Sequence, residues 1–334
     1  MKFGTTIPRE LIQRGADQPY GKLYDFVREV EDLGYEFSAI GHHRFAPDRS
    51  NNEPSAPLVM LAALLANTSR LKLLTSILLV ATYHPVDVAE QIATLQEMSN
   101  GRFILGAGMG YRQYEFDTVQ IPYKSRVSRF EEVLDVLRLA LSGEEFHYEG
   151  RHFNIPPTTI TPPRPAGTTT PIWMGANSEA GLRRAAAKAD GWLAGYPYSI
   201  GDIAAYMKLY REAAAGTGNS TTLCLMREFH IAETRAAVDP RWLEGVIAIN
   251  RAYRSQGASI SNDSLDEERT PTIDEYVPNR AVAGTPDDCI RELTATRDAV
   301  QPDSIMLTPV GLHDPELYIR ELRLFAKTVM PAFG

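Results

Sequence analysis

Short apolar runs alternate along this chain with longer stretches in which apolar residues recur every three or four positions. Runs of the first kind predict buried strands, and stretches of the second kind predict amphipathic helices. The runs that qualify as strands are Lys2–Ile7, Phe37–Ile40, Leu71–Ser76, Arg102–Ala107, Pro171–Met174, Gly191–Ala194, Thr222–His230 and Asp303–Leu307. The segments predicted as helices are 24–33, 54–67, 85–98, 127–141, 178–189, 200–215, 240–256, 285–300 and 314–328.

This alternation indicates a parallel sheet whose crossover helices lie outside it. A closed barrel of eight β/α units, with insertions, needs about the 334 residues present. The first strand also lacks the GxGxxG turn of a doubly wound dinucleotide-binding unit. The sequence therefore predicts the α/β class and a single domain over residues 1–334, a (β/α)8 TIM barrel with insertions.

Three segments interrupt the alternation. Residues from about 108 to 126 form a polar and aromatic excursion, and residues 144–171 are rich in Pro, Thr and Gly. Residues 257–280 are polar and lack a clear period. We interpret them as an excursion, a loop insertion with a short hairpin, and a mobile lid.

Composition and charge narrow the class of protein. A net charge of -8 disfavours nucleic acid and anionic membrane surfaces as partners. No apolar run is long enough to span a bilayer, and no leader pattern opens the chain, so we expect a cytoplasmic protein that acts on small molecules. Cys224 and Cys289 have no metal-like spacing, and we expect both to be packing thiols and no metal site.

Working residues of a β/α barrel gather where strands end. Gly41, His42 and His43 follow the second strand. Adjacent residues there point in different directions and no third ligand accompanies them, which disfavours a metal. One imidazole could transfer a proton or hold an anionic ring edge, or either could be structural.

Later strand ends add further candidates. His84 precedes a helix-starting proline, as a cap or as part of an active site. The glycine-rich stretch 106–110 leads into Tyr111–Glu115 and lets the backbone approach a flat or phosphorylated ligand. Asn177 and Ser178 precede a helix, where they form either a phosphate seat or an ordinary N-cap.

These segments together resemble the bacterial-luciferase family of flavin monooxygenases. The resemblance rests on the ordered set 42–45, 82–86, 98–103, 115–116, 171–175, 190–192, 282–289 and 329–331. It implies a barrel that binds reduced FMN, or in some branches a deazaflavin coenzyme of the F420 type, at its carboxyl mouth. It also implies a non-prolyl cis peptide bond between Ser76 and Ile77.

The resemblance assigns roles to individual residues. His42 matches the catalytic histidine, His84 and Glu115 match positions near the flavin, and Asn177 begins the match to the phosphate-binding turn. The candidate catalytic residues are His42, His43 and His84. The candidate cofactor-binding residues are Ser76, Ile77, Gly108, Met109, Arg112, Glu115, Ala176, Asn177, Ser178 and Gly181.

Two positions depart from the family pattern. Gly41 stands where many members have Glu, and Met109 stands where luciferase has an arginine near the phosphate. Arg112, Arg183 or Arg184 could supply the missing positive charge. The resemblance therefore does not imply light emission.

The expected enzyme is a two-component monooxygenase. A separate flavin reductase would supply FMNH2, which would react with O2 to a C4a-peroxyflavin, and one oxygen atom would pass to a small organic substrate. The resemblance also predicts a homodimer. Two alternatives stay open: a deazaflavin-dependent oxidoreductase that transfers hydride, and a catalytically idle flavin-binding protein.

Overall fold

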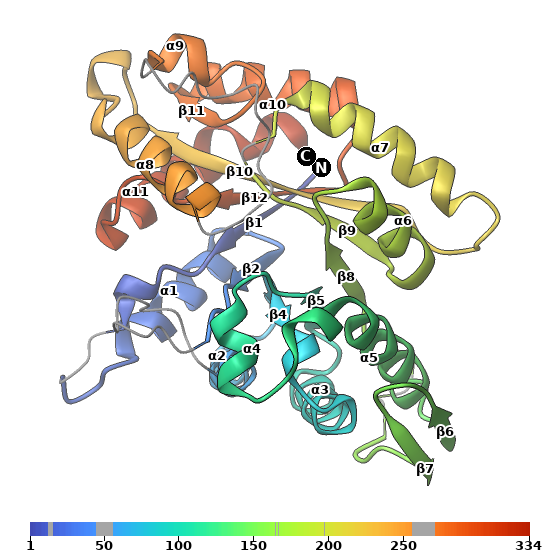
Figure 1. Ribbon diagram of the computed structural model, residues 1–334. Coiled ribbons are helices and arrows are strands. Elements are labelled where there is room, and N and C mark those ends of the chain that lie inside the picture. Colours follow the sequence, from blue (N-terminus) through green and yellow to red (C-terminus); the bar gives the residue numbers. More distant parts are fainter. Residues whose placement is uncertain (13–15, 45–55, 164, 166, 197, 256–270) are drawn as a thin grey trace.

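The computed structural model describes residues 1–334 apart from 13–15, 45–55, 164, 166, 197 and 256–270 (Figure 1). Its strands are β1 (Lys2–Thr6), β2 (Phe37–Ile40), β3 (Lys72–Thr75), β4 (Leu78–Leu79), β5 (Phe103–Gly108), β6 (Phe146–Glu149), β7 (Asn154–Thr158), β8 (Ile172–Gly175), β9 (Gly191–Ala194), β10 (Thr222–Ile231), β11 (Val282–Gly284) and β12 (Ser304–Thr308). Its helices are α1 (Gly21–Asp32), α2 (Pro57–Ala66), α3 (Pro85–Ser99), α4 (Gln113–Thr118), α5 (Arg126–Ala140), α6 (Glu179–Lys188), α7 (Ile200–Ala214), α8 (Arg241–Ser255), α9 (Ile273–Tyr276), α10 (Pro286–Val300) and α11 (Pro315–Thr328).

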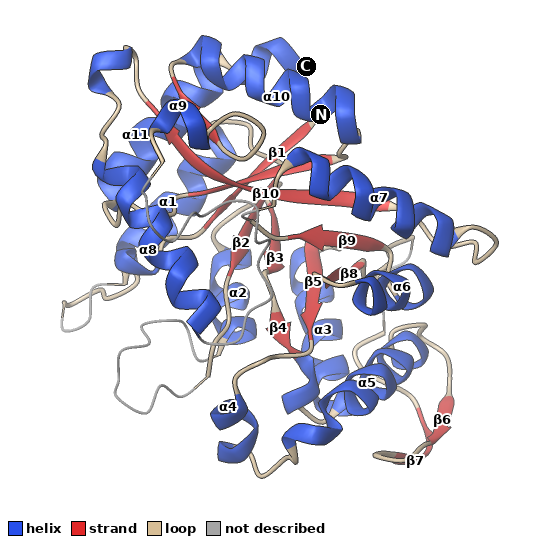
Figure 2. Ribbon diagram, turned by 45° about the horizontal axis from the view of Figure 1, so that its top comes forward, coloured by secondary structure: helices blue, strands red, loops and turns tan. Residues whose placement is uncertain are grey.

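Eight parallel strands close into a barrel in the order β1, β2, β3, β5, β8, β9, β10, β12 and back to β1. These are the eight strands that the apolar runs predicted, so the predicted (β/α)8 barrel is confirmed. Helices surround the strands (Figure 2). A small apolar cluster that includes Phe37, Ala39 and Met306 comes from alternate strand positions, and a larger one joins strands to helices.

The β3–β5 contact shows how side chains shape the barrel mouth. Regular pairing of these strands covers Leu73 and Leu74 only. Beyond it, the Thr75 hydroxyl donates to the Gly106 carbonyl at 2.8 Å and accepts from the Gly106 amide at 3.0 Å. A Cβ at Gly106 would lie 1.7 Å from the Thr75 carbonyl oxygen, so only glycine permits this approach.

The interruptions contain the short hairpin expected in the loop insertion and short helices that the pattern did not indicate. The excursion holds the short helix α4, and the loop insertion holds the antiparallel pair β6 and β7. Residues 257–270 of the predicted lid lie outside the described residues. Residues 271–280 include α9, whose Tyr276 is buried against Trp242 of α8, and the lid stays a prediction. In the described part of the chain, every helix is too short or too polar to cross a bilayer.

Candidate active site

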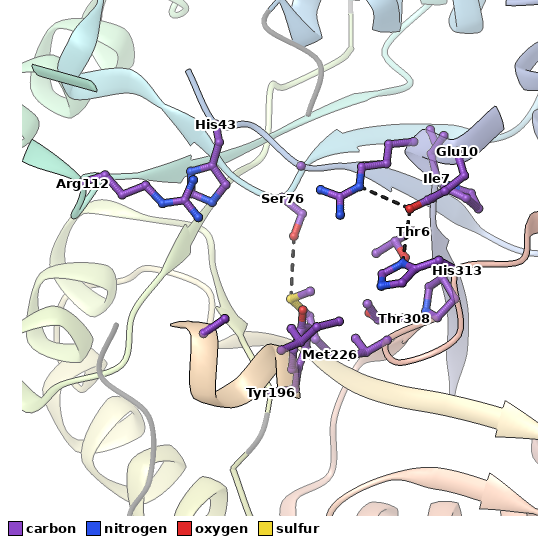
Figure 3. A pocket seen from close by; sticks show the side chains of 17 residues that line it. Thr6, Ile7, Glu10, His43, Ser76, Arg112, Tyr196, Met226, Thr308 and His313 are labelled. Carbon is purple, nitrogen blue, oxygen red and sulfur yellow. Dashed lines mark hydrogen bonds and ion pairs between the residues drawn. The ribbon is translucent and has the colours of Figure 1, made fainter. Parts of the chain in front are cut away.

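A cavity of about 330 Å³ lies at the carboxyl ends of the barrel strands (Figure 3). Its lining comes from residues at or after the ends of β1, β2, β3, β5, β9 and β12, from β10, and from one face of α8. The candidate residues that line it are His43, Ser76 and Arg112. The structure therefore brings three of the predicted site residues together at one cavity, and their roles stay predictions.

His43 faces this cavity and is held by a buried carboxylate. Its Nδ1 lies 3.2 Å from Oε1 of Glu115, which is fully buried, so the ring donates to the carboxylate. The same oxygen accepts the backbone N–H of Arg44 at 2.7 Å. These bonds fix the His43 ring and leave its Nε2 as the nitrogen available to a ligand.

His42 is buried beside the barrel and does not line the cavity. Its Nδ1 accepts the Leu79 N–H at 3.2 Å, so the proton of the neutral ring sits on Nε2, for which the described residues provide no acceptor. Burial, together with Arg44 and His43, lowers the pKa of His42 to about 3. His42 is therefore neutral near pH 7, and His43, not His42, is the member of the pair that reaches the cavity.

Arg112 supplies positive charge at the same end of the cavity (Figure 3). Burial opposes its charge, but Tyr111, Tyr114 and Glu115 together raise the pKa of Arg112 above its ordinary value. Its guanidinium lies 5.5 Å from the ring centre of Tyr111, whose edge also contacts His43. Arg112 and His43 thus share one neighbour and form a polar end to the cavity.

The peptide bond between Ser76 and Ile77 is cis, as the resemblance implied. Ser76 lines the cavity, and its hydroxyl lies 3.7 Å from the sulfur of Met226 across it. Ile77 packs against Gly108, because a Cβ on Gly108 would lie 1.7 Å from Cδ1 of Ile77. Gly108 therefore makes room for the Ile77 side chain.

The predicted phosphate-binding turn lies outside this cavity, beside the loop after β9. Asn177 and Ser178 are exposed, and Ser178 accepts the Gly181 N–H at 3.2 Å as the N-cap of α6. The Ala176 carbonyl accepts the indole N–H of Trp192 at 2.9 Å. Met109 is half-buried against the main core. The N-cap reading of Ser178 is therefore correct, and a phosphate role for the turn stays a prediction.

His84 and two of the candidate arginines are not brought to the cavity. His84 is exposed at the start of α3, with its ring 5.5 Å from Phe153 of the hairpin insertion. Arg183 pairs with Glu179 on its own helix, and Arg184 pairs with Glu131 of α5. Of the three arginines that could supply the positive charge missing at Met109, Arg112 alone lines the cavity.

Sequence reasoning missed much of the lining. These residues are Thr6, Ile7, Pro8, Arg9, Glu10, Tyr196, Met226, Ile249, Ala252, Thr308, Pro309, Val310 and His313. Most of them lie at or just after a strand that was predicted, so the strand-end rule would have found them had it been applied to the first and last strands. The described residues contain no group of three or more His, Cys, Asp or Glu side chains that could hold a metal ion.

Comparison with known proteins identifies the family. Residues 1–301 match the sequence profile of the luciferase-like monooxygenases. The chain belongs to the luciferase-like monooxygenase family. The family resemblance inferred from the ordered motifs is thereby confirmed.

Solved structures share the whole barrel with this family member. Monooxygenase RslO1 from Streptomyces bottropensis is 24% identical, with a TM-score of 0.83 and 100% of each chain covered. The oxygenating constituent of 3,6-diketocamphane monooxygenase from Pseudomonas putida, in complex with FMN, is 19% identical with a TM-score of 0.79, covering 99% of this chain and 98% of that one. The coenzyme F420 dependent tetrahydromethanopterin reductase of Methanopyrus kandleri is 20% identical with a TM-score of 0.76, covering 100% and 99%. These likenesses establish the fold.

Proposed function

We propose that this protein is an oxidoreductase, and specifically a monooxygenase that uses reduced FMN and O2 to oxygenate a small organic substrate. The observation that carries the proposal is the polar end of the cavity. There His43, oriented by buried Glu115, and charged Arg112 lie at the carboxyl mouth of a luciferase-like barrel. The FMN complex of a protein with the same fold supports this choice of cofactor.

The residues of the cavity fit a flavin. Reduced FMN carries negative charge on the pyrimidine edge of its ring, and Arg112 offers a guanidinium for that edge. Ser76 and Ile77 would support the ring, while the amides at the start of α6, beside Ser178, would receive the phosphate. When bound, FMN would supply the electrons that activate O2.

The side chains of the protein would then manage charge and protons. Arg112 would hold the anionic ring edge, and His43 would move a proton at its Nε2, since its Nδ1 is already engaged by Glu115. Apolar lining from Ile7, Met226 and Val310 would keep water away from the reacting atoms.

A second candidate function is hydride transfer with a deazaflavin coenzyme. It is supported by the F420-dependent reductase of M. kandleri, which resembles this chain about as closely as the FMN enzyme does. Both cofactors have a flat tricyclic ring, so the cavity alone does not separate them.

Two protein partners belong to the proposal. Reduced FMN would come from a flavin reductase, as expected for a two-component monooxygenase. We also propose a homodimer through α2 and α3. Helix α2 is apolar on all sides, and Val59 on α2 and Met98 on α3 are exposed.

Arg112→Met is expected to weaken binding of reduced FMN about tenfold or more. A hydrogen bond to a charged group contributes about 1.5 to 3 kcal/mol, and the substitution keeps most of the side-chain volume. Anaerobic fluorescence titration measures the change. Arg323→Met removes an exposed arginine of α11 that pairs with Glu29 and does not line the cavity, and it is the matched control, for which we expect affinity within a factor of about two. Equal loss in both variants would contradict the role given to Arg112.

The oxygenase proposal is tested by the fate of isotopically labelled O2. Purified protein, reduced FMN from any flavin reductase and a panel of small ketones, aldehydes and amines are incubated under labelled O2. The proposal predicts one labelled oxygen atom in at least one product. Substrate dehydrogenated or reduced with the deazaflavin coenzyme, without label, would favour the second candidate.

A further inference from the structure

One wall of the cavity is apolar and belongs to a separate packing unit. Tyr196, Ile249 and Val310 line the cavity and also belong to a second hydrophobic cluster, apart from the main core. This cluster joins α8 and α9 to β11 and to the loops after β9 and β12. Ile249 and Val310 of this cluster, together with the exposed Ala252 one turn along α8, line the cavity, and we call these three side chains the apolar wall.

Helix α8 presents this wall by its own period. Ile249 and Ala252 are three residues apart, which places them on one face of the helix. Between them Asn250 points elsewhere and is fully buried. The two cavity-facing side chains therefore project together toward the barrel mouth.

A buried polar network fixes α8 in place. The Asn250 amide donates to Glu228 of β10 at 3.1 Å, and the Tyr276 hydroxyl donates to the other carboxylate oxygen at 2.7 Å. A Cβ at Gly245 would lie 2.2 Å from the Gly311 carbonyl oxygen, so the helix backbone rests directly on the loop after β12. The wall is thus held by contacts that leave it little freedom to adapt to a ligand.

The charges near the wall are already engaged. Glu10 lies 3.3 Å from Arg9 and 3.3 Å from His313, so its carboxylate contacts both side chains at the rim. Arg112 lies at the other end of the cavity from Glu10 and His313, where the proposed function puts the flavin (Figure 3). The apolar side chains of the wall offer a charged substrate group no hydrogen bond to replace its lost hydration.

We infer that the apolar wall selects the substrate: a compact, uncharged molecule whose apolar body packs on Ile249, Ala252 and Val310, with Ala252 setting the size limit. This inference rests on the proposed function for the reaction of the substrate, which would meet FMN bound at His43 and Arg112, whereas the size limit set by the wall can be measured without FMN. Ala252 has the smallest side chain of the wall, so a larger residue at this position would reduce the volume left for the substrate.

Rigid rings of graded size test this wall. Binding of cyclopentanone, cyclohexanone and cyclooctanone is followed by saturation-transfer NMR, with and without saturating FMN. We expect Ala252→Leu to weaken cyclooctanone about tenfold and cyclopentanone less than about threefold. Ile249→Ala should shift preference toward cyclooctanone by about threefold or more. Ala248→Leu is the matched control, one turn earlier on α8, exposed and outside the lining; it should change none of the three.

Three results would overturn the inference. One is failure of the wild type to bind any of the three rings. Another is a loss in Ala252→Leu that is equal for all three rings, as a merely structural effect would be. The third is tighter binding of cyclohexanecarboxylate than of cyclohexanone. A titration of the same samples with reduced FMN reports on the proposed function separately: a shifted ring preference without FMN binding would reject the flavin proposal and keep the wall.

Discussion

His43→Ala is expected to lower the rate of substrate oxygenation about 100-fold or more. A positioned general acid or base typically contributes two to four orders of magnitude, and His43 is the histidine whose ring reaches the polar end of the cavity. Glu115 fixes its Nδ1–H, so the free Nε2 is the site of proton transfer. Stopped-flow measurement with prebound reduced FMN and the substrate found by isotope labelling gives the rate.

Two further variants decide whether the loss is chemical. Glu115→Gln keeps the size of the orienting side chain but removes its charge, and we expect an intermediate loss of about tenfold. His84→Ala removes an exposed histidine that packs on Phe153 away from the cavity, and it should keep the rate within about twofold. A loss in His84→Ala as large as in His43→Ala would contradict the assignment of His43.

Gly106→Ala is expected to reduce the free energy of unfolding by about 3 kcal/mol or more. The new methyl group would overlap the backbone carbonyl of Thr75, which cannot move without disturbing the bonds that join β3 to β5. Because Ser76 is the next residue after Thr75 and lines the cavity, a shift of the Thr75 backbone would also change the shape of the cavity. Urea unfolding should show a lower midpoint with an unchanged slope.

Gly201→Ala makes the same change where space is available. Gly201 is exposed near the start of α7, and the nearest atom to its Cβ position is the Ser199 hydroxyl at 3.7 Å. Replacing a helical glycine by alanine should stabilise the protein by about 0.5 to 1 kcal/mol. If Gly106→Ala were as stable as Gly201→Ala, the close approach of β3 and β5 would be wrong.

The barrel could be predicted because parallel barrel strands are buried on both faces and appear as short apolar runs. The same property hid which histidine enters the cavity. All four residues of β2 are buried, so its composition does not reveal which side of the strand faces the barrel interior. In the structure the side chains of Phe37 and Ala39 point into the barrel interior. Because alternate residues of a strand face the same side, Gly41 and His43 face the cavity and His42 faces away from it.

Other parts of the site depend on contacts distant in sequence. The period of α8 predicted a helix but not that Ile249 and Ala252 cover the barrel mouth, because that placement comes from Glu228, Tyr276 and Gly311. Helix α9 did leave a local signal. Thr272 and Glu275 form a capping box, and the spacing of these two residues is visible in the sequence.

The most direct test of the central claim is an anaerobic titration of the purified protein with reduced FMN and, separately, with the reduced deazaflavin coenzyme. We expect saturable binding of reduced FMN that is weakened in Arg112→Met and unchanged in Arg323→Met. Binding of the deazaflavin alone would contradict the central claim and identify hydride transfer as the chemistry of this barrel.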